Sequence, residues 1–364
     1  MVPEQSAEFR ALVEKFTDPF LGQSLGSARA VEIAEQKGDT AHVRVALGFP
    51  IADYGPEFAR ALQAHISAAG GPPGVRIELV SKITAHAVQR QLSPMGSIRN
   101  IVAVASGKGG VGKSTVAANL ALAWARQGAK VGILDADIYG PSLPIMLGLT
   151  GQRPTSPDNK TIIPLQAHGV VAMSIGFLVD PEQALVFRGP MATGALSQLL
   201  RDTVWGDLDY LVIDMPPGTG DIQLTLSQQV PVAGAVIVTT PQDIALADAR
   251  KGLRMFEKVN VPVLGIVENM SVHVCSNCGH VEHLFGAGGG ARMAAQYGVE
   301  LLGELPLDVR VREEADGGAP TVVAAPDSPR AAPYFLMARR TAAVLARRGK
   351  DRSSVFPKIV VEES

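Results

Sequence analysis

Apolar and polar positions near the start of the chain follow the pattern of a small unit of alternating helices and strands. Apolar residues recur at helical spacing over residues 7–16, before Asp18-Pro19 ends the run. The same reasoning predicts strands at residues 28–34, 41–48 and 74–81, and a second helix at residues 56–68. We therefore expect residues 1–85 to form a small α/β domain and residues 86–99, which lack strand periodicity, to form a linker.

Beyond this linker the pattern changes to runs of consecutive apolar, β-branched residues separated by helix-compatible segments. The expected strands lie at residues 101–105, 130–135, 170–175, 209–214, 235–240 and 262–269. Strands without polar alternation are typical of a parallel sheet covered by helices on both faces. We predict a doubly wound, mostly parallel α/β domain over residues 100–348, followed by a C-terminal tail at 349–364.

Composition and charge narrow the class of protein. The chain has 364 residues, of which 46% are apolar, enough to bury a core in each of two domains. Its 33 basic and 35 acidic side chains give a formal net charge of −2, which argues against a dedicated nucleic-acid binder. No apolar run approaches the roughly 20 residues of a membrane span, and the N-terminus lacks the pattern of a signal peptide. We expect a soluble, cytoplasmic protein with no stable membrane association.

A glycine-rich segment directly after the first strand of the larger domain carries the clearest chemistry. It matches the strand–GxxxxGK[ST]–helix pattern of the phosphate-binding loop, or P-loop. In that loop, backbone N–H groups and a helix N-terminus face a polyphosphate, so a P-loop NTPase that binds ATP and Mg²⁺ is predicted. Lys113 would reach the β- and γ-phosphates, Ser114 would bind Mg²⁺ and Thr115 would bond a phosphate oxygen. The loop residues are Gly107, Lys108, Gly109, Gly110, Val111, Gly112, Lys113, Ser114 and Thr115.

Two acidic positions follow at the ends of core strands, where open α/β sheets bind their ligands. Asp135 begins the segment Asp-Ala-Asp, and Asp214 precedes a PPGTG segment that contains Gly218. A carboxylate beside the P-loop can hold Mg²⁺ through water, and a glycine N–H can contact the γ-phosphate. An aspartate after a strand can also serve only as a helix cap.

The two cysteines exclude a disulfide-built fold and form half of a metal site. Cys275 and Cys278 make one CxxC pair, whereas a zinc site or a [4Fe–4S] cluster generally has four protein ligands. Two chains related by a two-fold axis would supply four. An interchain zinc site, an intrachain zinc site with His280 and His283, and a thioredoxin-like redox pair remain alternatives.

The loop segment KGGVGKST resembles the deviant P-loop of the ATPases that include MinD, the partition ATPases, the nitrogenase iron protein and the Mrp-type carriers. This resemblance implies that Lys108 crosses a homodimer interface to the partner's nucleotide. It makes Asp137 the residue that orients the attacking water, beside the catalytic lysines Lys108 and Lys113. It also implies that Asn269 reads the adenine edge, and that Asp135 and Asp214 lie in the outer shell of the metal.

A longer set of segments resembles the Mrp/ApbC family of iron–sulfur cluster carriers. The segments are SGKGGVGKST, DADIYGPS, FRGPM, DMPPGTGD and ENMSVHVCSNCGH, and the resemblance spans residues 100–348. The N-terminal unit, with DPFLGQSL, resembles the small domain fused to bacterial members. The family implies a homodimer that holds a [4Fe–4S] cluster between its two CxxC loops, hydrolyses ATP slowly, and exchanges the cluster with scaffold proteins and apoproteins.

Two alternative functions for the protein, and the role of one residue, remain to be decided. A MinD-like or ParA-like regulatory ATPase with a zinc-bridged dimer would carry a basic amphipathic C-terminal helix, and residues 333–348 contain arginines among apolar positions. An electron-transfer reductase like the nitrogenase iron protein has its ligand cysteines far apart in sequence, unlike the CxxC pair here. Arg188 either contacts phosphate or caps a loop.

Overall fold

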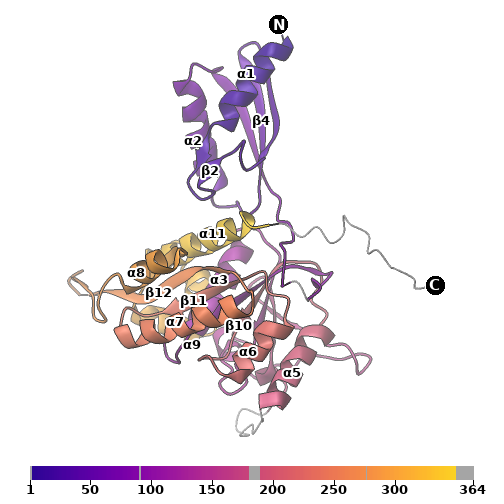
Figure 1. The fold of residues 1–364 in the computed structure, drawn as a ribbon, viewed down its shortest axis with the longest axis vertical. Helices are drawn as coiled ribbons and strands as arrows, with labels where there is room; N and C mark the ends of the chain where they lie inside the picture. The colour runs from indigo at the N-terminus through magenta and orange to yellow at the C-terminus, as the bar shows by residue number, and fades with distance from the viewer. Residues whose placement is uncertain (1, 90–91, 180–188, 276, 350–364) are drawn as a thin grey trace.

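The computed structural model describes residues 2–89, 92–179, 189–275 and 277–349, in which a three-stranded and a nine-stranded sheet organise the chain, beside one two-stranded sheet. Figure 1 shows a small N-terminal part standing on a larger part that contains the P-loop. No helix in the described ranges is both long and apolar enough to cross a membrane.

The small part consists of a three-stranded sheet covered by two helices. Its main elements are α1 (Val2–Glu14), β3 (Val31–Lys37), β4 (Thr40–Leu47), α2 (Gly55–Ala68) and β5 (Gly74–Ser81). The predicted order of helix, strand, strand, helix, strand is confirmed, and two short strands, β1 (Thr17–Asp18) and β2 (Gln23–Ser24), were not predicted. Every second residue of β4 is buried, so one face of this sheet forms the core against the helices.

The larger part is a nine-stranded sheet with the order β13-β12-β11-β6-β10-β7-β9-β8 and with β14 beside β12. The six predicted strands correspond to β6 (Ile98–Ala105), β7 (Val131–Asp135), β9 (Val170–Ser174), β10 (Leu208–Asp214), β11 (Gly234–Thr239) and β12 (Val263–Val274). These six are mutually parallel, which confirms the predicted doubly wound sheet. The unpredicted strands are β8 (Leu165–Ala167), β13 (Val281–Glu282) and β14 (Glu300–Pro306). β8 pairs antiparallel with β9, and β13 pairs antiparallel with β12.

The strand boundaries differ most from the predictions at β3, β6 and β12, and β3 lies three residues later than the predicted 28–34. β6 begins at Ile98, inside the segment predicted as linker, because Ile98 is buried and lies in register with Leu208. The strand predicted to end at Asn269 continues as β12 to Val274. Its second half leaves the buried sheet and pairs with β13, so its side chains are no longer uniformly apolar and the pattern used for prediction stops.

Helices cover both faces of the large sheet (Figure 1). The helices of this part are α3 (Lys113–Arg126), α4 (Leu143–Met146), α5 (Gly189–Asp202), α6 (Asp221–Gln229), α7 (Asp243–Lys258), α8 (Gly289–Tyr297), α9 (Val309–Asp316), α10 (Thr321–Ala324) and α11 (Ala332–Ala346), with a 3₁₀ turn at Ile175–Phe177. Trp124 of α3 stacks on Tyr210 with ring centroids 4.3 Å apart, and its Nε1 donates to the carbonyl of Ala338. These contacts pack α3 between the sheet and α11.

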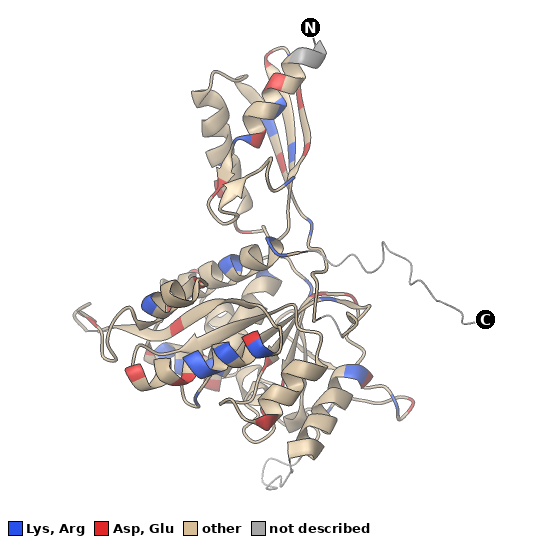
Figure 2. Cartoon of the chain, viewed as in Figure 1, with Lys and Arg blue, Asp and Glu red and all other residues tan. Residues whose placement is uncertain are grey.

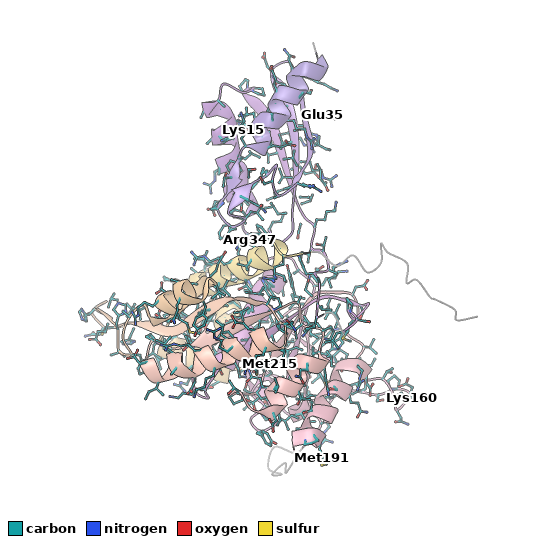
Figure 3. The ribbon with its side chains drawn as sticks, in the orientation of Figure 1. Lys15, Glu35, Lys160, Met191, Met215 and Arg347 are labelled. Carbon is teal, nitrogen blue, oxygen red and sulfur yellow. The ribbon has the colours of Figure 1, made fainter. Side chains whose placement is uncertain are left out.

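The small part meets the larger one at the ends of α3 and α11. Asp53 Oδ2 accepts hydrogen bonds from Gln127 Nε2 at 3.1 Å and from Arg339 NH2 at 2.7 Å. The Arg339 guanidinium also lies 4.7 Å from the centre of the Tyr54 ring. Figure 3 places Arg347, just beyond the end of α11, at the same junction. The small part therefore rests on the far end of the helix that begins at the P-loop.

Candidate nucleotide site and cysteine hairpin

The P-loop connects β6 to α3 in a conformation that requires glycine at defined positions. Gly110 and Gly112 have φ angles of 80° and 79°, a region that L side chains rarely adopt. A Cβ atom on Gly112 would lie 2.2 Å from Asn269 Nδ2, and one on Gly107 would lie 2.1 Å from the carbonyl of Asp248. The loop is thus packed against β12 on one side and α7 on another.

A cavity of about 590 Å³ opens over this loop. Most of the predicted phosphate-contacting residues line it, together with Asp137 and Asn269. Its opposite wall comes from the end of β14 and from α9, which sequence reasoning missed: Pro306, Leu307, Asp308, Val311, Arg312, Ala315 and Asp316. The available signal was Asp308 followed by a helical segment, since Asp308 caps α9 by accepting a hydrogen bond from Arg310 N at 2.9 Å.

Buried charge concentrates at the base of the cavity. The ammonium group of Lys113 forms an ion pair with Asp214 and lies 4.0 Å from Asp137 Oδ2. The side chains of Lys113 and Asp214 are 6% and 0% exposed, so this pair is shielded from water. Lys113 Nζ is also 3.3 Å from Ser114 Oγ. The structure thus brings together the predicted lysine, serine and two carboxylates.

The carboxyl group of Asp135 lies next to this ion pair and is held by backbone hydrogen bonds. It accepts hydrogen bonds from the backbone N–H groups of Ser142 and Leu143, at 3.0 and 3.2 Å, where α4 begins. Burial, and then the charge of Asp214, raise the pKa of Asp135 to about 7, while backbone donors act in the opposite direction. Burial likewise raises the pKa of Asp137, against the lowering effect of Lys113. The cap interpretation of Asp135 therefore has direct geometric support.

The donor set fits a magnesium nucleotide. Asp214 Oδ2 and Ser142 Oγ are buried without a hydrogen-bond partner among the described residues, so both can bind a further group. Gly109 and Gly110 have open space where a Cβ would be, which lets a phosphate approach the backbone. Hydroxyl and carboxylate oxygens beside a phosphate cradle are the ligands that Mg²⁺ prefers.

Two of the predicted contact groups, at Gly218 and Asn269, form hydrogen bonds within the chain, and a third residue, Lys108, is exposed. The Gly218 N–H donates to the carbonyl of Ser106 at 3.0 Å, so it does not point freely at a phosphate. Asn269 Nδ2 donates to the carbonyl of Val111 at 2.9 Å, and the amide therefore holds the P-loop as well as lining the cavity. Lys108 is exposed at the cavity mouth. The roles predicted for these residues stay predictions, and Arg188 lies outside the described residues.

The two cysteines lie at the tip of the hairpin formed by β12 and β13. Cys275 N donates to the carbonyl of His280 at 2.9 Å, and Gly279 N donates to the carbonyl of Cys275 at 2.9 Å, so the CxxC forms a tight turn. Both thiols are free, and Cys278 is exposed. Hydrogen bonds from the backbone of Cys278 and Asn277 lower the pKa of Cys275, which favours the thiolate that binds metals.

This geometry argues against two of the alternatives for the cysteine pair. No group of three or more His, Cys, Asp or Glu side chains within the described ranges is placed to hold a metal ion. His283 Nδ1 pairs with the carbonyl of Ser271, and His280 and His283 form no such group with the two thiols. The CxxC opens no helix, because it connects two strands, which contradicts a thioredoxin-like arrangement. Cys275 and Cys278 remain as a pair of thiols at the tip of the hairpin.

The strand–loop–helix cradle at the carboxyl edge of a doubly wound sheet defines a P-loop NTPase. A family model described as the NUBPL iron-transfer P-loop NTPase, of the ParA type, matches residues 97–342. The chain therefore belongs to this family of iron–sulfur cluster transfer proteins.

Similar proteins extend this assignment. An iron–sulfur cluster carrier protein of Pseudomonas fragi is 62% identical over 274 residues, covering 75% of this chain and 96% of its own length. That of Haemophilus influenzae is 48% identical over 361 residues, covering 99% and 96%. A nucleotide-binding protein of Archaeoglobus fulgidus, solved in complex with ADP, has a TM-score of 0.55 at 43% identity, covering 61% of this chain and 87% of its own. The cell division ATPase MinD of Pyrococcus furiosus has a TM-score of 0.52 at 25% identity, covering 66% and 97%.

Proposed function

We propose that this protein is an ATP-dependent homodimeric carrier that binds a [4Fe–4S] cluster between two cysteine hairpins and passes it to apoproteins. The observation that carries the proposal is the continuity of β12, which contacts the P-loop through Asn269 and presents Cys275 at its end. Residues 1–85 and 100–348 act as separate domains joined by a linker in this proposal. The reduced thiols that it needs fit a cytoplasmic location.

The cluster is the cargo, and the half-site sets the stoichiometry. Each chain supplies two thiols, Cys275 and Cys278, so four ligands require two chains. The hairpin is exposed, so a two-fold axis can bring it to the same hairpin of a second copy. A cluster held between two chains is released when those chains separate, which suits a carrier.

The P-loop side would bind and hydrolyse ATP. Lys113 would exchange its ion pair with Asp214 for the phosphates, and Ser114, with Asp214 and Asp135 in the outer shell, would hold Mg²⁺. Asp137 would orient the attacking water, and the exposed Lys108 would reach the partner's nucleotide. Binding of the γ-phosphate would draw the Gly218 N–H away from Ser106. We expect slow turnover, since a switch needs no fast chemistry.

A bulge in β12 gives nucleotide binding a route to the cysteines. The register against β14 shifts between Glu268 and Val272, and Met270 has a left-handed φ of 55°. Asn269 and Met270, inside the bulge, line the nucleotide cavity. Cys275 follows five residues after Met270, so a rearrangement of the bulge would reorient the hairpin.

Anaerobic reconstitution with iron and sulfide tests the proposal. We expect about four iron atoms per dimer and a broad visible absorption band in the wild type, both abolished by Cys275→Ala or Cys278→Ala. His280→Ala keeps both thiols, serves as the matched control, and should retain the iron. Transfer is measured by reactivation of an apo [4Fe–4S] enzyme. One zinc ion per dimer, with no iron uptake or visible band, would instead support a zinc-bridged regulatory ATPase.

A further inference from the structure

A row of basic side chains follows the outer side of α7. Arg250, Arg254 and Lys258 are spaced four residues apart, so they lie on one helix face, and Lys251 lies beside them. Figure 2 shows this concentration of blue on α7. Together with Thr219, Leu224 and Met255, these four residues line a groove of about 460 Å³ between α7 and the start of α6.

Much of this positive charge is not neutralised within the chain. Lys251 and Arg254 pair with Asp248 and Glu257, at 3.0 and 3.1 Å, on the exposed surface. Exposed pairs of this kind contribute little stability and exchange partners readily. Arg250 and Lys258 form no ion pair with any residue that the structure describes. In a chain with a net charge of −2, the groove is a local positive field.

The groove adjoins the segments that face the nucleotide. Thr219, in its wall, directly follows Gly218, whose N–H bonds Ser106 just before the P-loop. On its other side α7 packs closely against the P-loop, where a Cβ on Gly107 would lie 2.1 Å from the Asp248 carbonyl. A partner in the groove therefore lies one helix away from the bound nucleotide.

We propose that this groove docks an acidic segment of the apoprotein or scaffold with which the carrier exchanges its cluster. The docked segment pairs its carboxylates with Arg250, Arg254 and Lys258, and places an apolar side chain on Leu224 and Met255. The basic row spans nine residues of helix, whose ends lie about 12 Å apart, which matches a short peptide segment. The apolar floor favours a protein partner over a nucleic acid. The inference rests on the proposed carrier function and adds the chemistry of its partners.

Peptide binding tests the docking surface without requiring a cluster. The probe is a fluorescein-labelled 12-residue peptide of aspartate and glutamate with one central leucine, and its lysine counterpart is the reference. We expect the acidic peptide to bind by fluorescence anisotropy, with an affinity that falls as salt rises. Arg250→Glu combined with Lys258→Glu should weaken this binding at least tenfold. The matched control combines Arg153→Glu with Lys160→Glu, the latter on a distant loop (Figure 3), and should bind like the wild type.

Cluster transfer to an apo [4Fe–4S] enzyme with an acidic surface is the second measurement. We expect the α7 variant to lower the bimolecular transfer rate about tenfold while cluster content and ATP hydrolysis stay at the wild-type level. Unchanged peptide binding in the α7 variant would overturn the proposal. The proposal would also be overturned if the α7 variant lost peptide binding but kept the wild-type transfer rate. It would be overturned as well if the variant lost binding to a DNA oligonucleotide and not to the peptide. Failure of the wild type to take up iron would refute the carrier function, and the peptide result would still decide whether the groove binds acidic chains.

Discussion

Removing the buried lysine of the P-loop should destabilise the nucleotide-free protein strongly. Lys113 is the cation that neutralises Asp214, and both side chains are almost fully shielded from water. Lys113→Met keeps most of the side-chain volume but removes the charge. Asp214 then keeps a buried carboxylate without its cation, next to the carboxyl group of Asp135.

The expected cost follows from the burial of the pair. Breaking a buried ion pair by removing one partner typically costs about 3–5 kcal/mol, whereas replacing both partners is far less costly. Asp214→Asn should cost less, about 1–3 kcal/mol, because Lys113 keeps Asp137 at 4.0 Å. The double variant should lose about 2–3 kcal/mol less stability than the two single variants lose together. Lys108→Met, on the exposed part of the same loop, should change stability by less than about 0.5 kcal/mol.

Urea unfolding without nucleotide or Mg²⁺ measures these differences. The protein has two tryptophans, Trp124 and Trp205, and both are buried in the larger part, so fluorescence reports on the unfolding of the part that holds the pair. A loss below about 1 kcal/mol for Lys113→Met would refute the reasoning. Strict additivity in the double variant would refute it as well, because the two side chains would then not interact.

Three further predictions concern the same regions. Because the folded pKa of Asp135 is raised from 3.8 to about 7, its contribution to stability is complete below about pH 4 and is lost as pH rises to about 7. Unfolding curves should show this slope in the wild type and not in Asp135→Asn. Gly112→Ala introduces a Cβ 2.2 Å from Asn269 Nδ2 at a left-handed φ, which should lower the free energy of unfolding by about 2–3 kcal/mol. The same variant should abolish ATP binding measured by calorimetry, and retained affinity would contradict the observed packing. In Cys278→Ala, which keeps the backbone donors, iodoacetamide should alkylate Cys275 with a pH midpoint below the ordinary thiol value, and a midpoint at or above it would argue against those donors.

The P-loop could be predicted from the sequence because its conformation is largely local. Glycines at 110 and 112 permit positive φ angles, and a helix follows directly, so neighbouring residues are enough to define the cradle. The six buried strands were predictable for a similar reason, since parallel strands covered on both faces are uniformly apolar. The prediction that Cys275 and Cys278 form half of a metal site likewise comes from their spacing alone.

β14 and the second half of β12 could not be predicted in this way. β14 contains two glutamates, a glycine and a proline among its seven residues, so it has no strand periodicity, and among the described strands it pairs only with β12. β12 beyond Asn269 gains its structure from β13 and from a bulge, both of which depend on distant residues. The resulting wall of the nucleotide cavity at β14 and α9 therefore appeared only in the folded chain.

By itself the sequence determined the phosphate cradle and the strand-end carboxylates, and it predicted half of a four-thiol site. The tertiary structure decided which of these groups meet. The sheet order places β12 two strands from β6, which brings Asn269 onto Gly112 across more than 150 residues of chain. It also decided that Asp135 caps α4 while Asp214 holds Lys113. Such contacts depend on which surfaces pack together, and packing is a property of the whole fold that no local pattern contains.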